Sequence, residues 1–287
     1  MSAHRIAIAT CKGNPLAAGA DEPLVRAFAE MDIDAKRVAW TDASADWATF
    51  DGVLVRSTWD WHLHPDRFGH WLTFAGKVTR VWNPPAQIAW SLDKHCLIDL
   101  ASRGVRTVAS SSIAGLEALR DFRSPWPDWV LKPALGATAY RTSRIRSDED
   151  LAIWQRENKD FNGILIAQKF EPKVLEIGEV SLVFIGGEYS HAVRKVARAG
   201  DFRVQAEFGG TAEAIEASAA DRVLADLCLS TVGVPLAFAR IDLLHDESGE
   251  PILIECELAE PDLFFGECPE AARKLANVVA GFIPASR

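Results

Sequence analysis

The sequence predicts an α/β protein in which an N-terminal α/β lobe is followed by two further, strand-rich lobes. Strand and helix signals alternate over residues 1–90, which is typical of a parallel sheet with crossover helices. From Trp129 onward, strand signals dominate. Two turns, Gly186-Gly187 and Ser248-Gly249, each separate two apolar runs and therefore predict β-hairpins. We expect a first domain at residues 1–90 and a second at residues 91–287.

The expected elements follow from hydrophobic periodicity and from the positions of Gly, Pro and Asn. In the first domain we expect, in chain order, a strand at 5–10, a helix at 21–31, a strand at 53–56 and a helix at 65–74. A helix at 87–103, ended by Gly104, leads into the second domain, which we divide into subdomains of about 110–187 and 188–287. There we expect strands at 130–133, 139–145, 164–170, 180–185 and 189–196, and helices at 148–157, 217–232 and 269–282.

The hairpin around Ser248-Gly249 brings charged residues together. Asp242 and Glu255 lie six residues to either side of this turn, so a symmetric hairpin places the two carboxylates opposite each other. By the same count, Arg240 lies opposite Glu257. Because side chains alternate along a strand, these four residues share one face. The other face is expected to hold the apolar residues Ile241, Leu243, Ile252 and Ile254.

The three acids of this face, Asp242, Glu255 and Glu257, repel one another unless a cation lies among them. Ligand sets made only of oxygen suit Mg²⁺, or Mn²⁺ as an alternative, and Mg²⁺ commonly binds through a few carboxylates and substrate phosphates. The residues therefore predict a metal–phosphate site. The alternative is that the acids face solvent and that Arg240 only neutralises Glu257 as a cross-strand ion pair.

The bulk composition argues against several classes of partner. A net charge of −9 argues against nucleic acid, because a phosphate backbone is bound by a basic surface. No apolar run approaches the ~20 residues of a membrane span, so we expect no membrane partner. Five widely spaced cysteines without a C-x-x-C motif are typical of the reducing cytoplasm. We therefore expect a cytoplasmic protein, and we leave open whether it forms a homodimer.

Two lysines are candidates for phosphate contacts. Lys132 ends a buried strand and precedes Pro133 and a loop of small residues, 134–139, whose backbone amides can approach a phosphate. Lys94 lies in the helical region 87–103, where the alternative is an ordinary exposed lysine. The chain has no Walker-type G-x-x-x-x-G-K-[ST] motif and no G-x-G-x-x-G motif after the first strand. The P-loop and dinucleotide-binding classes therefore have no support.

The hairpin around Gly186-Gly187 carries a second charged pair. Glu179 and Arg194 each lie seven residues from this turn and are expected to face each other, either in a ligand site or as a structural ion pair. Arg203 lies in the glycine-bounded loop 199–210, for which we see no structural purpose. Loops of this kind often close over ligands, so Arg203 is a further candidate site residue.

Six motifs in this order resemble the ATP-grasp superfamily, and most of all its glutathione-synthetase-like branch. They are, in chain order, Ser91-Leu-Asp-Lys94, Val130-Leu-Lys132-Pro133, Ala167-Gln-Lys-Phe-Glu171, Gly178-Glu-Val-Ser181, the loop 200–210, and Arg240-Ile-Asp242 with Glu255-Cys-Glu257. The chain differs from the family pattern in having fewer glycines after Lys132 and in having Gln205 where asparagine is usual. Within the branch, Arg56-Ser-Thr-Trp-Asp-Trp61 and Ser190-His-Ala-Val-Arg-Lys195 most resemble the cycloserine-pathway ligases and their relatives.

The resemblance implies an α+β ATP-grasp fold, in which a pre-ATP-grasp domain precedes two subdomains that clasp ATP and Mg²⁺. It implies an ATP-dependent carboxylate–amine ligase that acts through an acyl phosphate on a small amino-acid-like substrate and releases ADP and phosphate. The residues it implicates are, for catalysis, Arg240 and Arg203; for the nucleotide, Lys94, Lys132, Gln168, Lys169, Phe170 and Glu179; for substrates, Arg194, Lys195, Ser57, Thr58 and Asp60; and for the metal, Asp242, Glu255 and Glu257.

Three other functions stay open on the sequence alone. The first is an ATP-grasp kinase that phosphorylates a hydroxyl group of a small molecule. The second is a nucleotide-binding regulator without turnover, which the presence of Arg240 and the full acidic set disfavours. The third is a peptide ligase that modifies a protein tail and needs a macromolecular acceptor.

Overall fold

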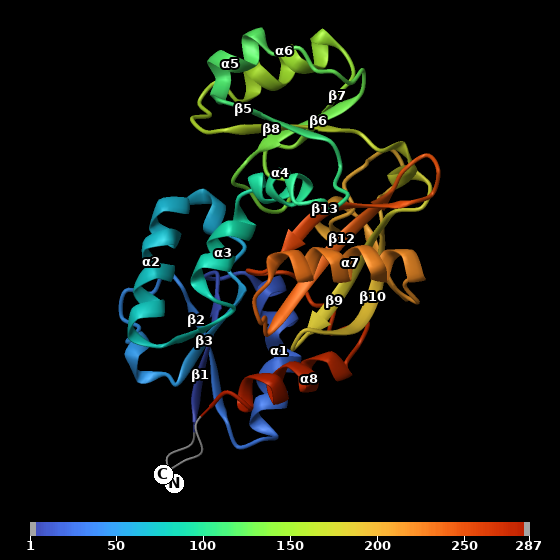
Figure 1. Cartoon of the computed structure of the whole chain (residues 1–287). Coiled ribbons are helices and arrows are strands. Elements are labelled where there is room, and N and C mark those ends of the chain that lie inside the picture. The colour runs from blue at the N-terminus through green and yellow to red at the C-terminus, as the bar shows by residue number, and fades with distance from the viewer. Residues whose placement is uncertain (1–3, 284–287) are drawn as a thin grey trace.

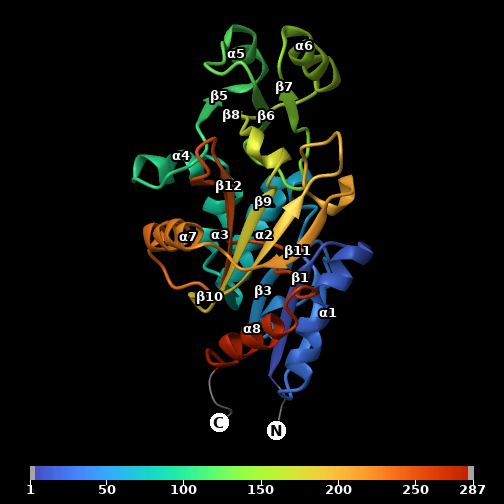
Figure 2. The same ribbon diagram turned by 90° about the vertical axis from the view of Figure 1, so that its right-hand side faces the viewer.

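A computed structural model describes residues 4–283 and shows three sheets (Figures 1 and 2). The first lobe holds a four-stranded parallel sheet in the order β2-β1-β3-β4. Its elements are β1 (Arg5–Thr10), α1 (Pro15–Ala29), β2 (Asp34–Ala39), η1 (Trp47–Thr49), β3 (Gly52–Ser57), η2 (Trp61–Leu63), α2 (Pro65–Val78) and β4 (Arg80–Trp82). Helix α1 begins before the predicted residue 21, because the Asn14 side chain accepts from the backbone N–H groups of Leu16 and Ala17.

The predicted helix at 87–103 is wrong as a single helix. The chain forms α3 (Pro85–Leu92) and α4 (His95–Ser102), with Asp93 between them in an extended conformation. Asp93 pairs with Leu135, and the Lys94 backbone N–H donates to the Ala134 carbonyl at 3.0 Å. This long-range pairing breaks the helix, and it places Lys94 beside the loop of small residues at 134–139.

The second sheet is a small one in the order β5-β8-β6-β7, with helices α5 and α6 on its outer side (Figure 1). Its elements are β5 (Ser110–Ile113), α5 (Gly115–Asp121), β6 (Trp129–Pro133), β7 (Ser143–Ile145), α6 (Asp148–Glu157) and β8 (Leu165–Lys169). Strand β7 is shorter than the predicted 139–145, because Thr138, Ala139 and Arg141 have left-handed φ angles of 50°, 54° and 51° and form a turning loop. The sheet has its own core, which includes Leu131, Trp154 and Ala167.

The third sheet is antiparallel and has the order β11-β10-β9-β12-β13. Its segment contains η3 (Pro172–Leu175), β9 (Glu179–Ile185), β10 (Glu188–Val196), η4 (Ala206–Phe208), β11 (Thr211–Ile215), α7 (Ala219–Val232), β12 (Phe238–His245), β13 (Pro251–Glu257) and α8 (Glu270–Ala280). Because β9 pairs with β10 and β12, this sheet begins before residue 187. The division of the chain into domains stays a prediction.

The first lobe and the five-stranded sheet share one hydrophobic core. Ile6 of β1 packs in the same buried cluster as Val183 of β9, Phe238 of β12 and Leu275 of α8. Helices α1 and α8 lie side by side in both views (Figures 1 and 2). Arg56 of β3 is fully buried and donates to the Pro261 carbonyl at 2.8 Å. None of the helices in residues 4–283 is long and apolar enough to cross a bilayer.

Candidate active site

The acidic hairpin has the predicted register up to a β-bulge. Arg240 pairs with Glu257 and Asp242 with Glu255, as expected. A bulge between Asp242 and Leu243 then inserts one extra residue, so that Leu243 pairs with Leu253. The prediction that Ile252 and Ile254 share a face with Ile241 and Leu243 is therefore wrong. Ile252 and Ile254 instead pack with Leu244 and Phe170, and Leu253 joins Ile241 and Leu243 in the core beneath α7.

The predicted metal ligands lie together. Carboxylate oxygens of Asp242, Glu255 and Glu257 lie within 4.8 Å of one another. Glu255 and Glu257 line a large cavity, and their side chains are 34% and 23% exposed, whereas Asp242 is fully buried. Burial raises the pKa of Glu257 well above its ordinary range, and the nearby charges of Glu255 and Asp242 add to this effect. A cation among these oxygens would stabilise the ionised carboxylates, so the cluster fits a divalent cation with oxygen ligands.

Two cations hold the buried carboxylate of Asp242. The Arg240 Nε donates to Asp242 Oδ1 at 2.9 Å, and the Lys195 Nζ lies 3.2 Å from Oδ2. Burial by itself raises the pKa of Asp242, but Arg240 and Lys195 outweigh it and lower the pKa below its ordinary value. Arg240 also pairs with Glu257 and donates to the Asp262 carbonyl at 3.2 Å. The guanidinium thus lies at the centre of the acidic cluster.

Two lysines line the same cavity as these acids. The Lys94 Nζ donates to the Gly136 carbonyl at 2.6 Å and lies 3.9 Å from Glu255 Oε1. Lys132 is only 7% exposed, and within residues 4–283 its ammonium forms no hydrogen bond and no ion pair. Burial lowers the pKa of Lys132 to about 8. A buried ammonium without an anionic partner is costly, so the site fits an anionic ligand such as a phosphate.

The cavity has a volume of about 740 Å³ and extends between the three sheets. One end is lined by Gln168, Lys169 and Phe170, which are among the residues predicted to bind the nucleotide, together with apolar side chains. The apolar residues of this end are Val130, Val174, Leu244 and Ile254. The other end is lined by α1, by Trp59 and Trp61, and by the loop 259–267. The cavity is large enough for a nucleotide and a small substrate together.

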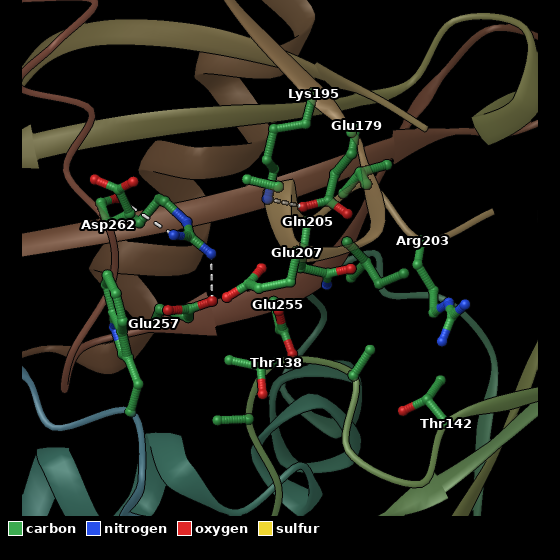
Figure 3. A pocket seen from close by; sticks show the side chains of 18 of the residues that line it. Thr138, Thr142, Glu179, Lys195, Arg203, Gln205, Glu207, Glu255, Glu257 and Asp262 are labelled. Atoms are coloured by element: carbon green, nitrogen blue, oxygen red, sulfur yellow. Dashed lines mark hydrogen bonds and ion pairs between the residues drawn. The ribbon is translucent and has the colours of Figure 1, made fainter. Parts of the chain in front are cut away.

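A second bulge gives Glu179 a different partner from the predicted one. The register of β9 and β10 shifts between Tyr189 and His191, so that Lys195, and not Arg194, lies opposite Glu179. The Lys195 ammonium pairs with the Glu179 carboxylate, and Figure 3 shows the two side chains pointing toward each other. The backbone of β10 passes close to Gly178. A Cβ at that position would lie 2.3 Å from the Lys195 carbonyl oxygen, so a larger residue does not fit there.

Four of the predicted substrate residues do not line the large cavity. Arg194 pairs with Glu213 on the exposed side of β10. Ser57 is bonded to Thr10 and Asp21, and Thr58 is fully buried. Asp60 accepts a hydrogen bond from the Trp40 indole N–H at 2.6 Å. Ser57, Thr58 and Asp60 thus belong to the interior of the first lobe, and the neighbouring Trp59 and Trp61 line the cavity in their place.

Arg203 lines the cavity but lies across it from the acidic cluster. Its guanidinium binds Asp201, with an Nη2–Oδ2 distance of 2.7 Å, and lies 3.7 Å from the centre of the Phe208 ring. In Figure 3, Arg203 extends toward Thr142, away from Glu257. The glycine-bounded loop therefore forms a wall of the cavity, as expected for a loop that covers a ligand.

Sequence reasoning missed the loop 259–267 and the two tryptophans that contact it. The Trp59 indole N–H donates to the Glu260 carbonyl at 2.9 Å, and the Trp61 indole N–H donates to the Glu260 carboxylate. Glu260 is 7% exposed and lines the cavity. Two signals were present in the sequence. The motif Arg56-Ser-Thr-Trp-Asp-Trp61 contains both tryptophans, but its polar residues were selected instead, and Glu260 is a further acid just after the Glu255-Cys-Glu257 motif.

Comparisons with known proteins agree with the predicted family. Residues 101–253 match the family described as prokaryotic glutathione synthetase, ATP-grasp domain, and residues 6–83 match the family described as D-cycloserine synthetase DcsG, N-terminal domain. The chain is 31% identical over 277 residues to the cycloserine biosynthesis protein DcsG of Streptomyces lavendulae, an alignment that covers 90% of this chain and 92% of the relative.

Solved structures give the same result. The crystal structure of D-cycloserine synthetase DcsG superimposes with a TM-score of 0.87 at 27% identity, over 97% of this chain and 99% of the other. The D-alanine–D-alanine ligase of Bacillus anthracis complexed with ATP has the same fold, with a TM-score of 0.67 at 13% identity over 97% of both chains. The predicted fold class and family are confirmed. The chain therefore belongs to the ATP-grasp ligases of the prokaryotic glutathione synthetase type.

Proposed function

We propose that this enzyme joins a carboxylate to an amine at the expense of ATP, through an acyl phosphate on a small amino-acid-like substrate. The observation that supports this proposal best is the buried ammonium of Lys132, which forms no ion pair within residues 4–283 and lines the same cavity as the carboxylates of Glu255 and Glu257. An anionic ligand would pair with the ammonium, and a cation bound with it would pair with the carboxylates. A nucleoside triphosphate with Mg²⁺ supplies both charges.

The geometry supports the following roles. Lys94 and Lys132 bind the triphosphate, and the segment Gln168–Phe170 binds the base in the apolar end of the cavity. Asp242, Glu255 and Glu257 would hold Mg²⁺, or Mn²⁺ as the alternative, and the bound metal would neutralise charge on the phosphates. Glu179, which the family resemblance implicates in nucleotide binding, is held in place by Lys195.

Arg240 is placed to act on the transferring phosphoryl group. Its guanidinium is 8% exposed, lines the cavity and is fixed by Asp242, Glu257 and the Asp262 carbonyl. A preorganised cation in a dry site stabilises negative charge that develops on oxygen atoms. Lys195 instead binds Glu179 and Asp242, so we assign it the positioning of these two carboxylates.

The proposal is tested by an ADP-release screen against amino acids, aminooxy acids and dipeptides in the presence of Mg²⁺. A substrate that releases ADP is then incubated with hydroxylamine, which converts an acyl phosphate into a hydroxamate. Hydroxamate formation supports the ligase. A stable phosphate ester would indicate a kinase, and ADP release only with a protein acceptor would indicate a peptide ligase.

The nature of the substrate and the cellular location are also proposals. The relative named above is a cycloserine biosynthesis protein, and we infer that this chain likewise takes a small amino-acid-like molecule, since the cavity of about 740 Å³ must also hold ATP. A cytoplasmic location is supported by the five cysteines, all of which are free thiols.

The ATP affinity should fall as the pH rises through the pKa of Lys132. Burial lowers this pKa to about 8, so the ammonium that attracts phosphate is present below that pH and is lost above it. We expect the KM for ATP to increase above pH 8 in the wild type. Replacement of Lys132 by Met should raise this KM by about tenfold or more at neutral pH, the equivalent of a lost charged hydrogen bond, and should flatten its pH dependence. An unchanged KM in steady-state kinetics would remove Lys132 from the phosphate site.

A further inference from the structure

Glu260 differs from the buried carboxylates of Glu179 and Glu171, which also line the cavity, because it forms no ion pair within the described residues. Glu179 pairs with Lys195, and Glu171 pairs with Lys169 at 3.0 Å. Among residues 4–283, the Glu260 side chain is hydrogen-bonded only to the neutral indole of Trp61, through Oε1. Within the part of the chain that the structure describes, no lysine or arginine forms an ion pair with it, although it is 7% exposed and lines the cavity.

The position of Glu260 is fixed from two sides. Its backbone carbonyl accepts from Trp59 at 2.9 Å and its carboxylate from Trp61, so the first lobe holds both its main chain and its side chain. It follows Glu257 by three residues and is near enough to Arg240 to feel the charge of the guanidinium. Glu260 therefore lies between the proposed phosphoryl-transfer centre and the end of the cavity formed by the first lobe.

A buried carboxylate that has no internal cation is costly unless a ligand supplies one. Burial raises the pKa of Glu260 to about 7, in the range of a group that exchanges protons at neutral pH. The charged groups that face it from the surrounding elements are Arg56, Lys94, Arg240, Glu255 and Glu257. Because none of the three cations among them pairs with it, the side chain is complementary to an ammonium group that arrives with a substrate.

We propose that Glu260 binds the ammonium group of the amine substrate and accepts the proton that this group must lose before it attacks. The inference rests on the ligase function proposed above. One proton moves from nitrogen to the carboxylate and frees the nitrogen lone pair. The lone pair forms the C–N bond to the carbonyl carbon of the acyl phosphate, and the bond between that carbon and the phosphate oxygen breaks. The phosphate leaves with the electron pair of that bond and with a second proton from nitrogen.

The test separates the two half-reactions in the Glu260→Gln variant. Glutamine has the shape of glutamate, and its carbonyl oxygen can still accept from Trp61, but it can neither carry negative charge nor take up a proton. The probes are two small nucleophiles: ammonium chloride, a cation at neutral pH, and hydroxylamine, which is neutral there. With the carboxylate found in the ADP screen, we expect amide formation from ammonium to fall by about 10²-fold or more, while hydroxamate formation stays close to wild type.

The pH profile is a second readout that a purely structural role would not change. The difference in the rate of amide formation between the variant and the wild type should become smaller at alkaline pH, where more of the ammonium is already ammonia in solution. Glu270→Gln, an exposed change at the start of α8, is the matched control and should behave as wild type. Urea denaturation checks that all variants are folded.

Each outcome has one meaning. Amide formation by Glu260→Gln at the wild-type rate, or loss of amide and hydroxamate formation in equal measure, overturns the role of Glu260. Absence of amide product from ammonium in the wild type, with hydroxamate present, overturns it as well. Absence of both hydroxamate and ADP in the wild type contradicts the ligase proposal instead.

Discussion

Replacing Glu255 by glutamine is expected to lower ADP release by at least about 10²-fold, the usual cost of removing one group that stabilises transition-state charge. Glu255 lines the cavity, shares the cluster with Asp242 and Glu257, and is the acid nearest to Lys94, at 3.9 Å. A neutral amide in its place weakens the site for a divalent cation. Because 34% of the side chain is exposed, the change leaves little uncompensated charge inside the protein, and the fold should persist.

The measurement is a coupled ADP assay over a range of Mg²⁺ concentrations. A weakened metal site predicts that a high Mg²⁺ concentration restores part of the activity. Glu250→Gln is the matched control, because Glu250 is an exposed acid of the same hairpin and should have no effect. Full ADP release by Glu255→Gln at all Mg²⁺ concentrations would refute the metal assignment.

Replacing Asp242 by asparagine is expected to abolish activity and also to destabilise the fold. Asp242 is fully buried, and Arg240 and Lys195 bind its carboxylate. Removing its charge leaves two buried cations with less compensation, and breaking a buried ion pair costs about 3–5 kcal/mol. The free energy of unfolding, measured by urea denaturation, should therefore fall by about this amount, whereas Glu255→Gln should change it by less than about 1 kcal/mol.

A double-mutant cycle isolates the cause. In the Lys195→Met background, Asp242→Asn should lower the free energy of unfolding clearly less than in the wild type, because only one buried cation, Arg240, then loses its partner. An equal cost in both backgrounds would show that Lys195 does not contribute to this effect. If Asp242→Asn unfolds at the same urea concentration as the wild type, the buried ion pairs do not stabilise the fold.

The turn residues made much of the site predictable, and the bulges limited the prediction. Counting outward from Ser248-Gly249 placed Asp242 opposite Glu255 correctly because two offsets cancel. Near the turn the pairing differs from this count by one residue, so that Leu244 pairs with Ile252, and the bulge between Asp242 and Leu243 restores the counted register. The same counting from Gly186-Gly187 selected Arg194 where Lys195 faces Glu179, since a bulge adds one residue without leaving a mark in composition. Because Arg194 and Lys195 are both basic and adjacent, the sequence does not show which of them faces Glu179.

Long-range contacts account for the other differences. The helix over 87–103 was periodic enough to be predicted as one piece, but the pairing of Asp93 with Leu135 interrupts it. Ser57 and Asp60 follow or end a strand and look accessible in the sequence, yet Asp21 and Trp40 bind them inside the first lobe. Partners that are distant in the chain decide such cases, and a single sequence does not show them.

The shared core of the first lobe and the five-stranded sheet has a consequence for how the enzyme works. Ile6, Val183 and Leu275 pack in one cluster, whereas the small sheet is built around a separate one that includes Trp154. We therefore expect the first lobe and the five-stranded sheet to move as one rigid body, and the small sheet to move relative to it as a separate body. Nucleotide exchange would then depend on this movement, while the end of the cavity that the first lobe lines would keep its shape throughout turnover.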